Sequence, residues 1–131
     1  MLFAHDLTES NMRFYYISRG LVWDSSIYKQ SWTTTANYRL ELNGLRIGIL
    51  RLSIADDILY IRDVQILPIN QSCGAGSFAI AFAERLAIEK NYSKIGLRVF
   101  SENPAKNLYN RLGFRDITHE SNIWLLIKRL T

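Results

Sequence analysis

The chain has 131 residues and a mass of 15.2 kDa, the size of one domain, so we expect residues 1–131 to form a single domain. Hydrophobic residues make up 48% and charged residues 21%, which excludes a disordered chain because such chains bury too little apolar surface. One cysteine, two histidines and the lack of a signal sequence favour a metal-free cytoplasmic protein that binds no membrane.

The net charge is +4, and the whole excess of basic residues lies in residues 66–131. The chain contains no run of Lys and Arg, and a net charge of +4 is small for a nucleic-acid-binding protein. We therefore expect no nucleic-acid partner. A small polyphosphate ligand suits this charge at least as well. Ordinary surface charge is the simpler explanation until a motif supports a ligand.

The N-terminal half predicts two helices followed by three strands. The helices lie between Thr8 and Trp32, break near Gly20, and have capping residues at 8–10 and 24–26. Apolar residues then alternate with polar ones on both sides of Asn43-Gly44, which is typical of a tight hairpin turn. After a second turn at Asp56-Asp57, a third strand is predicted over 58–67.

The second half alternates between helices and strands. A helix is predicted over 74–90 and a strand over 95–100, parallel to the 58–67 strand because a helix connects them. Asn103 and Pro104 begin a second helix, which Gly113 ends, and strands follow over 114–117 and 123–130. This order predicts an α/β (α+β) fold with a mixed, mostly antiparallel central sheet and helices on both faces.

A glycine-rich loop connects the third strand to its helix. Residues 74–79 (GAGSFA) match G-x-G-x-x-A, but six residues separate Leu67 from Gly74, and the strand over 95–100 has no acidic residue. Both features argue against a dinucleotide-binding fingerprint. What remains is a helix N-terminus with unpaired N–H groups and no Cβ at its glycines. This pattern is typical either of a site for an anion such as pyrophosphate or of a tight structural turn between a strand and a helix.

Two segments together resemble the motifs of the GNAT superfamily of N-acetyltransferases. Residues 66–77 (ILPINQSCGAGS) are similar to its acetyl-CoA motif, in which a strand leads into Q/R-x-x-G-x-G/A and a helix. Residues 103–114 (NPAKNLYNRLGF) are similar to its second motif, N-x-x-A-x-x-LY-x-x-LGF. The resemblance covers residues 38 to the C-terminus. It implies a GNAT-like fold in which the parallel strands over 58–67 and 95–100 splay apart around acetyl-CoA as co-substrate.

The resemblance also implies which residues contact the cofactor. Main-chain groups of the strand would pair with the pantetheine arm like an added strand, and loop amides would hold the pyrophosphate. Two residues of the second helix would touch the pantetheine or phosphate end. The implied contacts are Val64, Gln65, Ile66, Gln71, Ser72, Cys73, Gly74, Ala75, Gly76, Ser77, Asn103 and Lys106. The spacing from Asn103 to Tyr109 is one residue shorter than the common family form, so either the turn differs or Glu102 takes the asparagine's place.

Tyr109 matches the general acid of the family. A tyrosine is protonated at neutral pH and can protonate the thiolate that leaves when an amine displaces CoA. Asp63 is the acid nearest the predicted gap and is the candidate base, beside a base that acts through water and an amine that arrives already neutral. Because side chains alternate along a strand, one of Arg62 and Asp63 is expected on the acceptor side, and Arg62 argues against polyamines.

These residues predict an enzyme that transfers an acetyl group from acetyl-CoA to a primary amine of a small molecule or peptide, directly within a ternary complex. The alternative is a non-catalytic CoA-binding or regulatory module of the same fold. Trp23, Tyr28 and Trp32 either wall the acceptor pocket or pack in the core. The identity of the acceptor stays open, as does the choice between a monomer and a homodimer.

Overall fold

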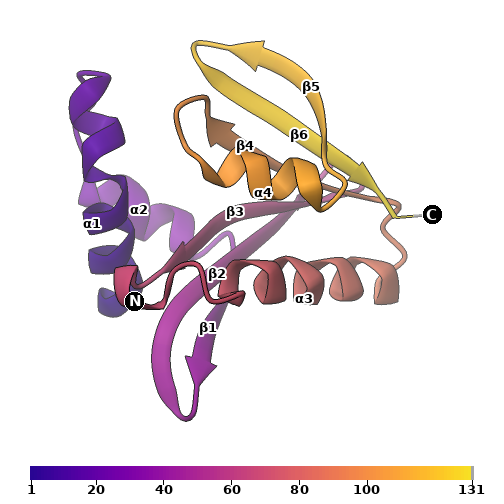
Figure 1. The fold of residues 1–131 in the computed structure, drawn as a ribbon, viewed down its shortest axis with the longest axis horizontal. Coiled ribbons are helices and arrows are strands. Elements are labelled where there is room, and N and C mark those ends of the chain that lie inside the picture. Colours follow the sequence, from indigo (N-terminus) through magenta and orange to yellow (C-terminus); the bar gives the residue numbers. More distant parts are fainter. Residues whose placement is uncertain (131) are drawn as a thin grey trace.

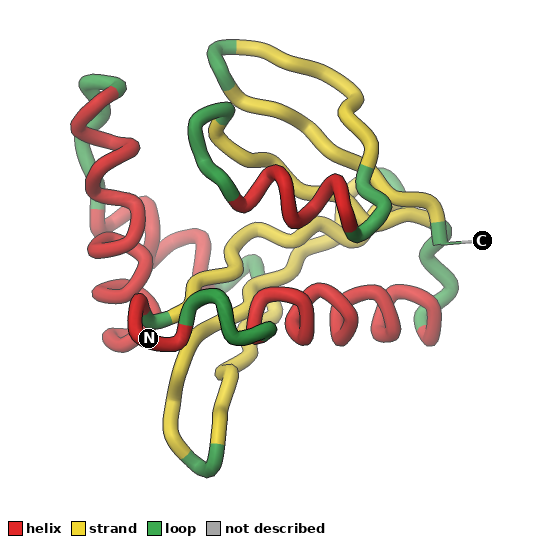
Figure 2. The backbone as a smooth tube through the Cα atoms, viewed as in Figure 1, coloured by secondary structure: helices red, strands yellow, loops and turns green. Residues whose placement is uncertain are grey.

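The computed structural model describes residues 1–130, and Figure 1 shows helices packed around a twisted sheet. The elements, in chain order, are α1 (Leu2–Ser18), α2 (Ser25–Trp32), β1 (Ala36–Leu42), β2 (Leu45–Ala55), β3 (Ile58–Ile66), the 3-10 helix η1 (Pro68–Asn70), α3 (Ala75–Glu89), β4 (Lys94–Phe100), α4 (Ala105–Arg111), β5 (Arg115–Glu120) and β6 (Ile123–Arg129). Loops, green in Figure 2, form short connections between them. No helix within 1–130 is both long and apolar enough to cross a membrane.

The six strands form one sheet in the order β1-β2-β3-β4-β6-β5. Every neighbouring pair is antiparallel except β3 and β4, which are parallel because α3 connects them. The predicted mixed, mostly antiparallel sheet is therefore confirmed. The turns at Asn43-Gly44 and Asp56-Asp57 both have two central residues with positive φ, as the tight hairpin predicted at Asn43-Gly44 requires.

Helices cover both faces of the sheet, and consecutive side chains of β2 contact helices on opposite faces. Leu50 and Leu52 are buried in the main apolar core with α3, whose residues Ala79, Ile80, Ala83 and Ala87 face the sheet. Arg51, between the two leucines, points instead at α2, where it contacts Tyr28 and Ser31. The helix α4 lies on the α3 side, because Tyr109 belongs to the same core. The face that carries α1 and α2 is called the acceptor face below.

The first helix begins earlier than the sequence suggested. Thr8 was expected near the start of a helix, but α1 begins at Leu2, and the Thr8 hydroxyl donates to the carbonyl of Ala4 at 2.8 Å inside the helix. Burial of Ala4, Leu7 and Thr8 holds the added residues against the protein, and a capping pattern in the sequence does not reveal such burial. The predicted break at Gly20 (φ 66°) and the cap at Asp24, which accepts from the N–H of Ser26, are confirmed.

A β-bulge interrupts the pairing of β2 with β3. Arg51 pairs with Asp63 and Leu52 pairs with Ile61, so Arg62 is an extra residue with no partner on β2. The extra residue breaks the alternation of side chains, and both Arg62 and Asp63 line the pocket on the acceptor face. The expectation that only one of them faces this side is therefore wrong, because it assumed a regular strand.

Candidate active site

The two parallel strands part halfway along their length. Pairing of β3 with β4 runs from Ile58 with Lys94 to Ile61 with Leu97 and then stops, although each strand continues for several residues. Figure 1 shows the two strands diverging beyond this point. The N–H of Leu67 donates to the Ile47 carbonyl of β2, so by alternation the main-chain groups of Val64 and Ile66 point away from β2 into the gap.

Six consecutive amides are free at the start of α3. Within residues 1–130, no hydrogen bond involves the N–H groups of residues 72–77, and the first one inside the helix runs from Phe78 N–H to the Gly74 carbonyl. Positive φ angles at Ser72 (63°) and Gly74 (88°) fold the loop so that it enters the helix directly. Free N–H groups at a helix N-terminus attract anions, because the helix dipole is positive there.

Glycine also keeps the space around this loop open. No heavy atom lies within 4 Å of the position that a Cβ at Gly74 would occupy, while a Cβ at Gly76 would lie 3.5 Å from Leu108 of α4. The two helices thus pack closely beside the loop, and the loop's own surface stays uncovered. Four of the predicted loop residues, Gln71 to Gly74, are exposed. The Cys73 thiol donates to the Asn70 carbonyl at 2.6 Å, within the loop itself.

The strand contacts differ in part from the expected ones. Asn11 and Gln71 both donate from their side chains to the carbonyl of Ile66, at 3.0 and 3.1 Å, so this carbonyl is engaged within the protein and leaves the Ile66 N–H for a ligand. Gln65 points to the acceptor face, where it donates to Asp63 and accepts from Asn11. The side chain of Gln65 therefore belongs to the surroundings of Asp63 rather than to a cofactor contact.

Tyr109 lies on α4 with only 8% of its surface exposed. Its ring packs edge to face on Phe114, with 6.1 Å between the centroids. Burial raises the pKa of Tyr109 to about 12, and the negative charge of Asp63 adds to this effect. The hydroxyl therefore keeps its proton at neutral pH, which is the state that a general acid needs.

Asp63 is held by a buried arginine. Its Oδ2 accepts from Arg51 Nη1 at 3.0 Å, and its Oδ1 accepts from the Gln65 amide at 3.4 Å. Burial raises the pKa of Asp63, while the positive charge of Arg51 opposes the shift. Each carboxylate oxygen thus has a partner within the protein.

Arg51 was not singled out in the sequence, although only 2% of its surface is exposed. Besides Asp63, it donates to three polar side chains, those of Ser31 at 2.7 Å and of Thr35 and Asn37 at 3.2 Å each. Its guanidinium carbon also lies 4.4 Å from the centroid of the Tyr28 ring. One signal was available: β2 is apolar on both sides of Arg51, and a charge in such a strand is rarely buried without a partner.

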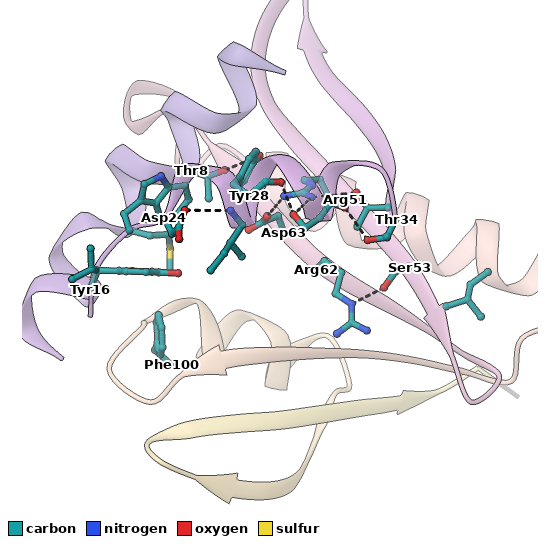
Figure 3. Close-up of a pocket in the computed structure, with 17 residues that line it drawn as sticks. Thr8, Tyr16, Asp24, Tyr28, Thr34, Arg51, Ser53, Arg62, Asp63 and Phe100 are labelled. Atoms are coloured by element: carbon teal, nitrogen blue, oxygen red, sulfur yellow. Dashed lines mark hydrogen bonds and ion pairs between the residues drawn. The ribbon is translucent and has the colours of Figure 1, made fainter. Parts of the chain in front are cut away.

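A pocket of about 720 Å³ lies on the acceptor face, between the two N-terminal helices and the strands β2 and β3 (Figure 3). Its aromatic lining consists of Tyr16, Trp23, Tyr28 and Phe100, and its charged lining of Asp24, Arg51, Arg62 and Asp63. Of the three aromatic residues for which the sequence left a pocket wall or core packing open, Trp23 and Tyr28 line this pocket. The third, Trp32, lies against Arg51 and lines a smaller neighbouring pocket.

The predicted residues before and within α4 have other partners in the structure. Asn103 caps the helix, because its Oδ1 accepts from the Ala105 N–H at 2.9 Å. Glu102 forms a two-pronged ion pair with Arg19 at the end of α1, with N–O distances of 2.9 and 2.7 Å. Lys106 pairs with Asp116 at 3.0 Å and lies over the Trp124 ring, so its ammonium is turned to the last two strands rather than to the loop.

Known proteins share both the sequence pattern and the fold. The model of the acetyltransferase (GNAT) family matches residues 4–114, while no curated protein matches. PaiA N-acetyltransferase from Thermoplasma acidophilum, crystallised with coenzyme A, is 14% identical with a TM-score of 0.73, over 96% of this chain and 87% of its own. A GNAT family acetyltransferase from Elizabethkingia anophelis with acetyl-CoA bound is 20% identical with a TM-score of 0.73, over 82% of this chain and 84% of its own.

The ribosomal-protein-S18-alanine N-acetyltransferase from Escherichia coli is also similar. It is 16% identical with a TM-score of 0.71, over 83% of this chain and 78% of its own. Identities this low show a common fold only, whereas the family match covers most of the chain. Together with the splayed strands, this match shows that the chain belongs to the GNAT family of acetyltransferases, whose co-substrate is acetyl-CoA.

Proposed function

We propose that this protein, as a single domain, is an N-acetyltransferase that moves an acetyl group from acetyl-CoA to a primary amine within a ternary complex. The observation that carries the proposal is the set of free amides at residues 72–77, which opens beside strands that stop pairing at Ile61 and Leu97. An anion-binding helix N-terminus and an unpaired strand edge are the two contacts that a pyrophosphate with an extended amide-containing arm needs.

The residues fit this co-substrate. The amides of residues 72–77 would hold the pyrophosphate, and the main-chain groups of Val64 with the N–H of Ile66 would pair with the pantetheine arm. Acetyl-CoA supplies the activated thioester carbonyl. The roles of Asn103 and Lys106 at the cofactor stay predictions from the family resemblance, since Asn103 caps α4 and Lys106 pairs with Asp116.

The chemistry divides between two sides of the gap. An amine nitrogen entering from the acceptor face attacks the thioester carbon, so that a carbon–nitrogen bond forms and the carbon–sulfur bond breaks. Tyr109 gives its proton to the departing sulfur. Its hydroxyl is protonated at neutral pH, although a pKa raised to about 12 makes it a weaker acid than a free tyrosine. The proton lost by the amine passes to Asp63, either directly or through water, and the raised pKa of Asp63 makes it a better base than an exposed aspartate.

A non-catalytic CoA-binding module is the second candidate, and one observation favours it. Both oxygens of Asp63 already have partners, Arg51 and Gln65, so the base is less free than in a site built only for proton transfer. This candidate shares the cofactor site with the enzyme and differs in having no turnover.

Two measurements test the proposal and separate the candidates. Isothermal titration should detect acetyl-CoA binding to the intact chain, and absence of binding would refute both candidates. Thiol release in the presence of a panel of primary amines should exceed the rate of acetyl-CoA hydrolysis without amine. Binding without amine-dependent thiol release would refute the enzyme and support the module.

A further inference from the structure

Two arginines flank the point where the parallel strands part. Pairing of β3 with β4 ends at Ile61 and Leu97, and Arg62 and Arg98 are the next residues on the two strands. Under the proposed function, on which this inference rests, the thioester carbonyl lies at this point, because the gap opens here. Both side chains are therefore at the place that an acceptor must approach.

Both arginines lie on the acceptor face. The ring of Tyr60 lies under both guanidinium groups, 4.6 Å from the Arg62 carbon and 5.8 Å from the Arg98 carbon. Phe100 lies two residues beyond Arg98, on the same side of β4, and it lines the pocket together with Arg62. Figure 3 shows the Arg62 guanidinium extending from β3 toward the strand that carries Phe100.

Neither arginine has an acidic partner within residues 1–130. Arg62 donates to the Ser53 hydroxyl, and Arg98 takes part in no ion pair or side-chain hydrogen bond. Burial lowers the pKa of Arg62, and the charge of Arg98 lowers it further, so the two cations repel each other. The neighbouring carboxylate of Asp63 does not offset the repulsion between Arg62 and Arg98, because it is paired with Arg51 at 3.0 Å.

We propose that Arg62 and Arg98 bind a carboxylate of the acceptor, so that the acceptor is a primary amine with a carboxylate a few bonds away, as in a free amino acid. Guanidinium groups match carboxylates with paired, charge-assisted hydrogen bonds. Asp63 follows Arg62 directly in the bulge, so an amine and a carboxylate can be held side by side only if they are close in the acceptor. The same two cations repel a polyamine, which has no anion to offer.

The test compares amino acids with their own carboxamides, which keep the amine and lose the anion. Thiol release is measured at saturating acetyl-CoA, and kcat/KM for each acid is divided by kcat/KM for its amide. The wild-type ratio should be about tenfold or more. Arg62→Gln and Arg98→Gln should each bring the ratio close to one through a higher KM for the acid.

Arg85→Gln serves as the matched control, because Arg85 is an exposed arginine on α3 and its replacement removes the same charge. This variant should keep the wild-type ratio, and thermal unfolding should show that all three variants fold. The inference is overturned if the panel shows no acid acetylated faster than its amide, or if both site variants keep the wild-type ratio. Acetyl-CoA binding in such a protein leaves the proposed function standing, whereas its absence overturns that function as well.

Discussion

The two sides of the gap between β3 and β4 are built in different ways. The loop over residues 72–77 presents main-chain N–H groups, and none of its side chains is needed to form that surface. The acceptor face presents side chains from four separate elements: Tyr28 and Ser31 from α2, Asn37 from β1, Arg51 from β2 and Asp63 from β3.

This difference explains why one side is visible in the sequence and the other is not. A surface of amides needs only a fixed backbone path, and the residues that fix it are neighbours, so they form a motif. A surface of side chains is assembled from positions far apart in the chain, and each of its residues depends on the others. Substitutions should therefore act in different ways on the two sides.

The largest effect on activity is expected from substitution of Tyr109, the proposed general acid. Tyr109→Phe should lower kcat by about 100-fold or more, because proton donation to a leaving group contributes 10²–10⁴-fold in typical enzymes. The KM for acetyl-CoA should change little, since the ring still packs on Phe114. Steady-state thiol release measures both quantities. An unchanged kcat would assign the proton to another donor.

The stability of the protein should depend on the buried ion pair of the acceptor face, between Arg51 and Asp63. Arg51→Met should lower the free energy of unfolding by about 3 kcal/mol, because it leaves Asp63 buried without its cation. Urea unfolding at pH 7 measures this, and the double variant Arg51→Met with Asp63→Asn should recover much of the loss. Arg39→Met, which breaks an exposed pair with Glu41, should cost less than about 1 kcal/mol. Equal losses in the two single variants would contradict a special role for the buried pair.

The raised pKa of Tyr109 should appear as a dependence of stability on pH. An unfolded tyrosine has a pKa near 10, whereas that of folded Tyr109 is about 12, so between these values the unfolded state loses its proton first. The stability linked to Tyr109 is thus complete below about pH 10 and falls as the pH rises toward 12. Urea unfolding at pH 9 and pH 11 should show wild type losing about 1 kcal/mol more than Tyr109→Phe. The same loss in both proteins would contradict the burial of this hydroxyl.

The smallest effects should come from the loop, and they should follow the backbone. Gly74→Ala should weaken acetyl-CoA binding about fivefold, because a residue with a Cβ is strained by about 1 kcal/mol at a φ of 88°. Ser77→Ala, which keeps the amide and this backbone, should change the affinity less than twofold. Isothermal titration measures both. A larger loss in the serine variant would show that side chains rather than amides hold the anion.

Much of the fold follows from local patterns in the sequence. The Asn43-Gly44 turn, the Asp24 cap and the parallel crossover through α3 each depend on a few neighbouring residues, and the structure confirms them. The last hairpin was less predictable. Strand β5 was expected over 114–117 but runs from Arg115 to Glu120, because its exposed end is held by pairing with β6 rather than by apolar residues.

The candidate site divides in the same way. The loop and Tyr109 were identified because their flanking residues form motifs. The partners of Arg51 were not, because Ser31, Asn37 and Asp63 come from three elements that meet only in the folded chain. The position of Arg62 was also missed, since a bulge is a property of two paired strands and neither sequence alone contains it.

That single inserted residue has a consequence for how β3 can change over time. On its inner side β3 carries apolar residues of its own, such as Ile61 and Val64, which pack in or against the main core. Deleting Arg62 would leave Ile61, Asp63 and Val64 in regular alternation, with Asp63 still on the acceptor face and its neighbours still in the core. A deletion at another position of β3 would instead turn the residues on one side of it to the opposite face of the sheet, because side chains alternate along a strand.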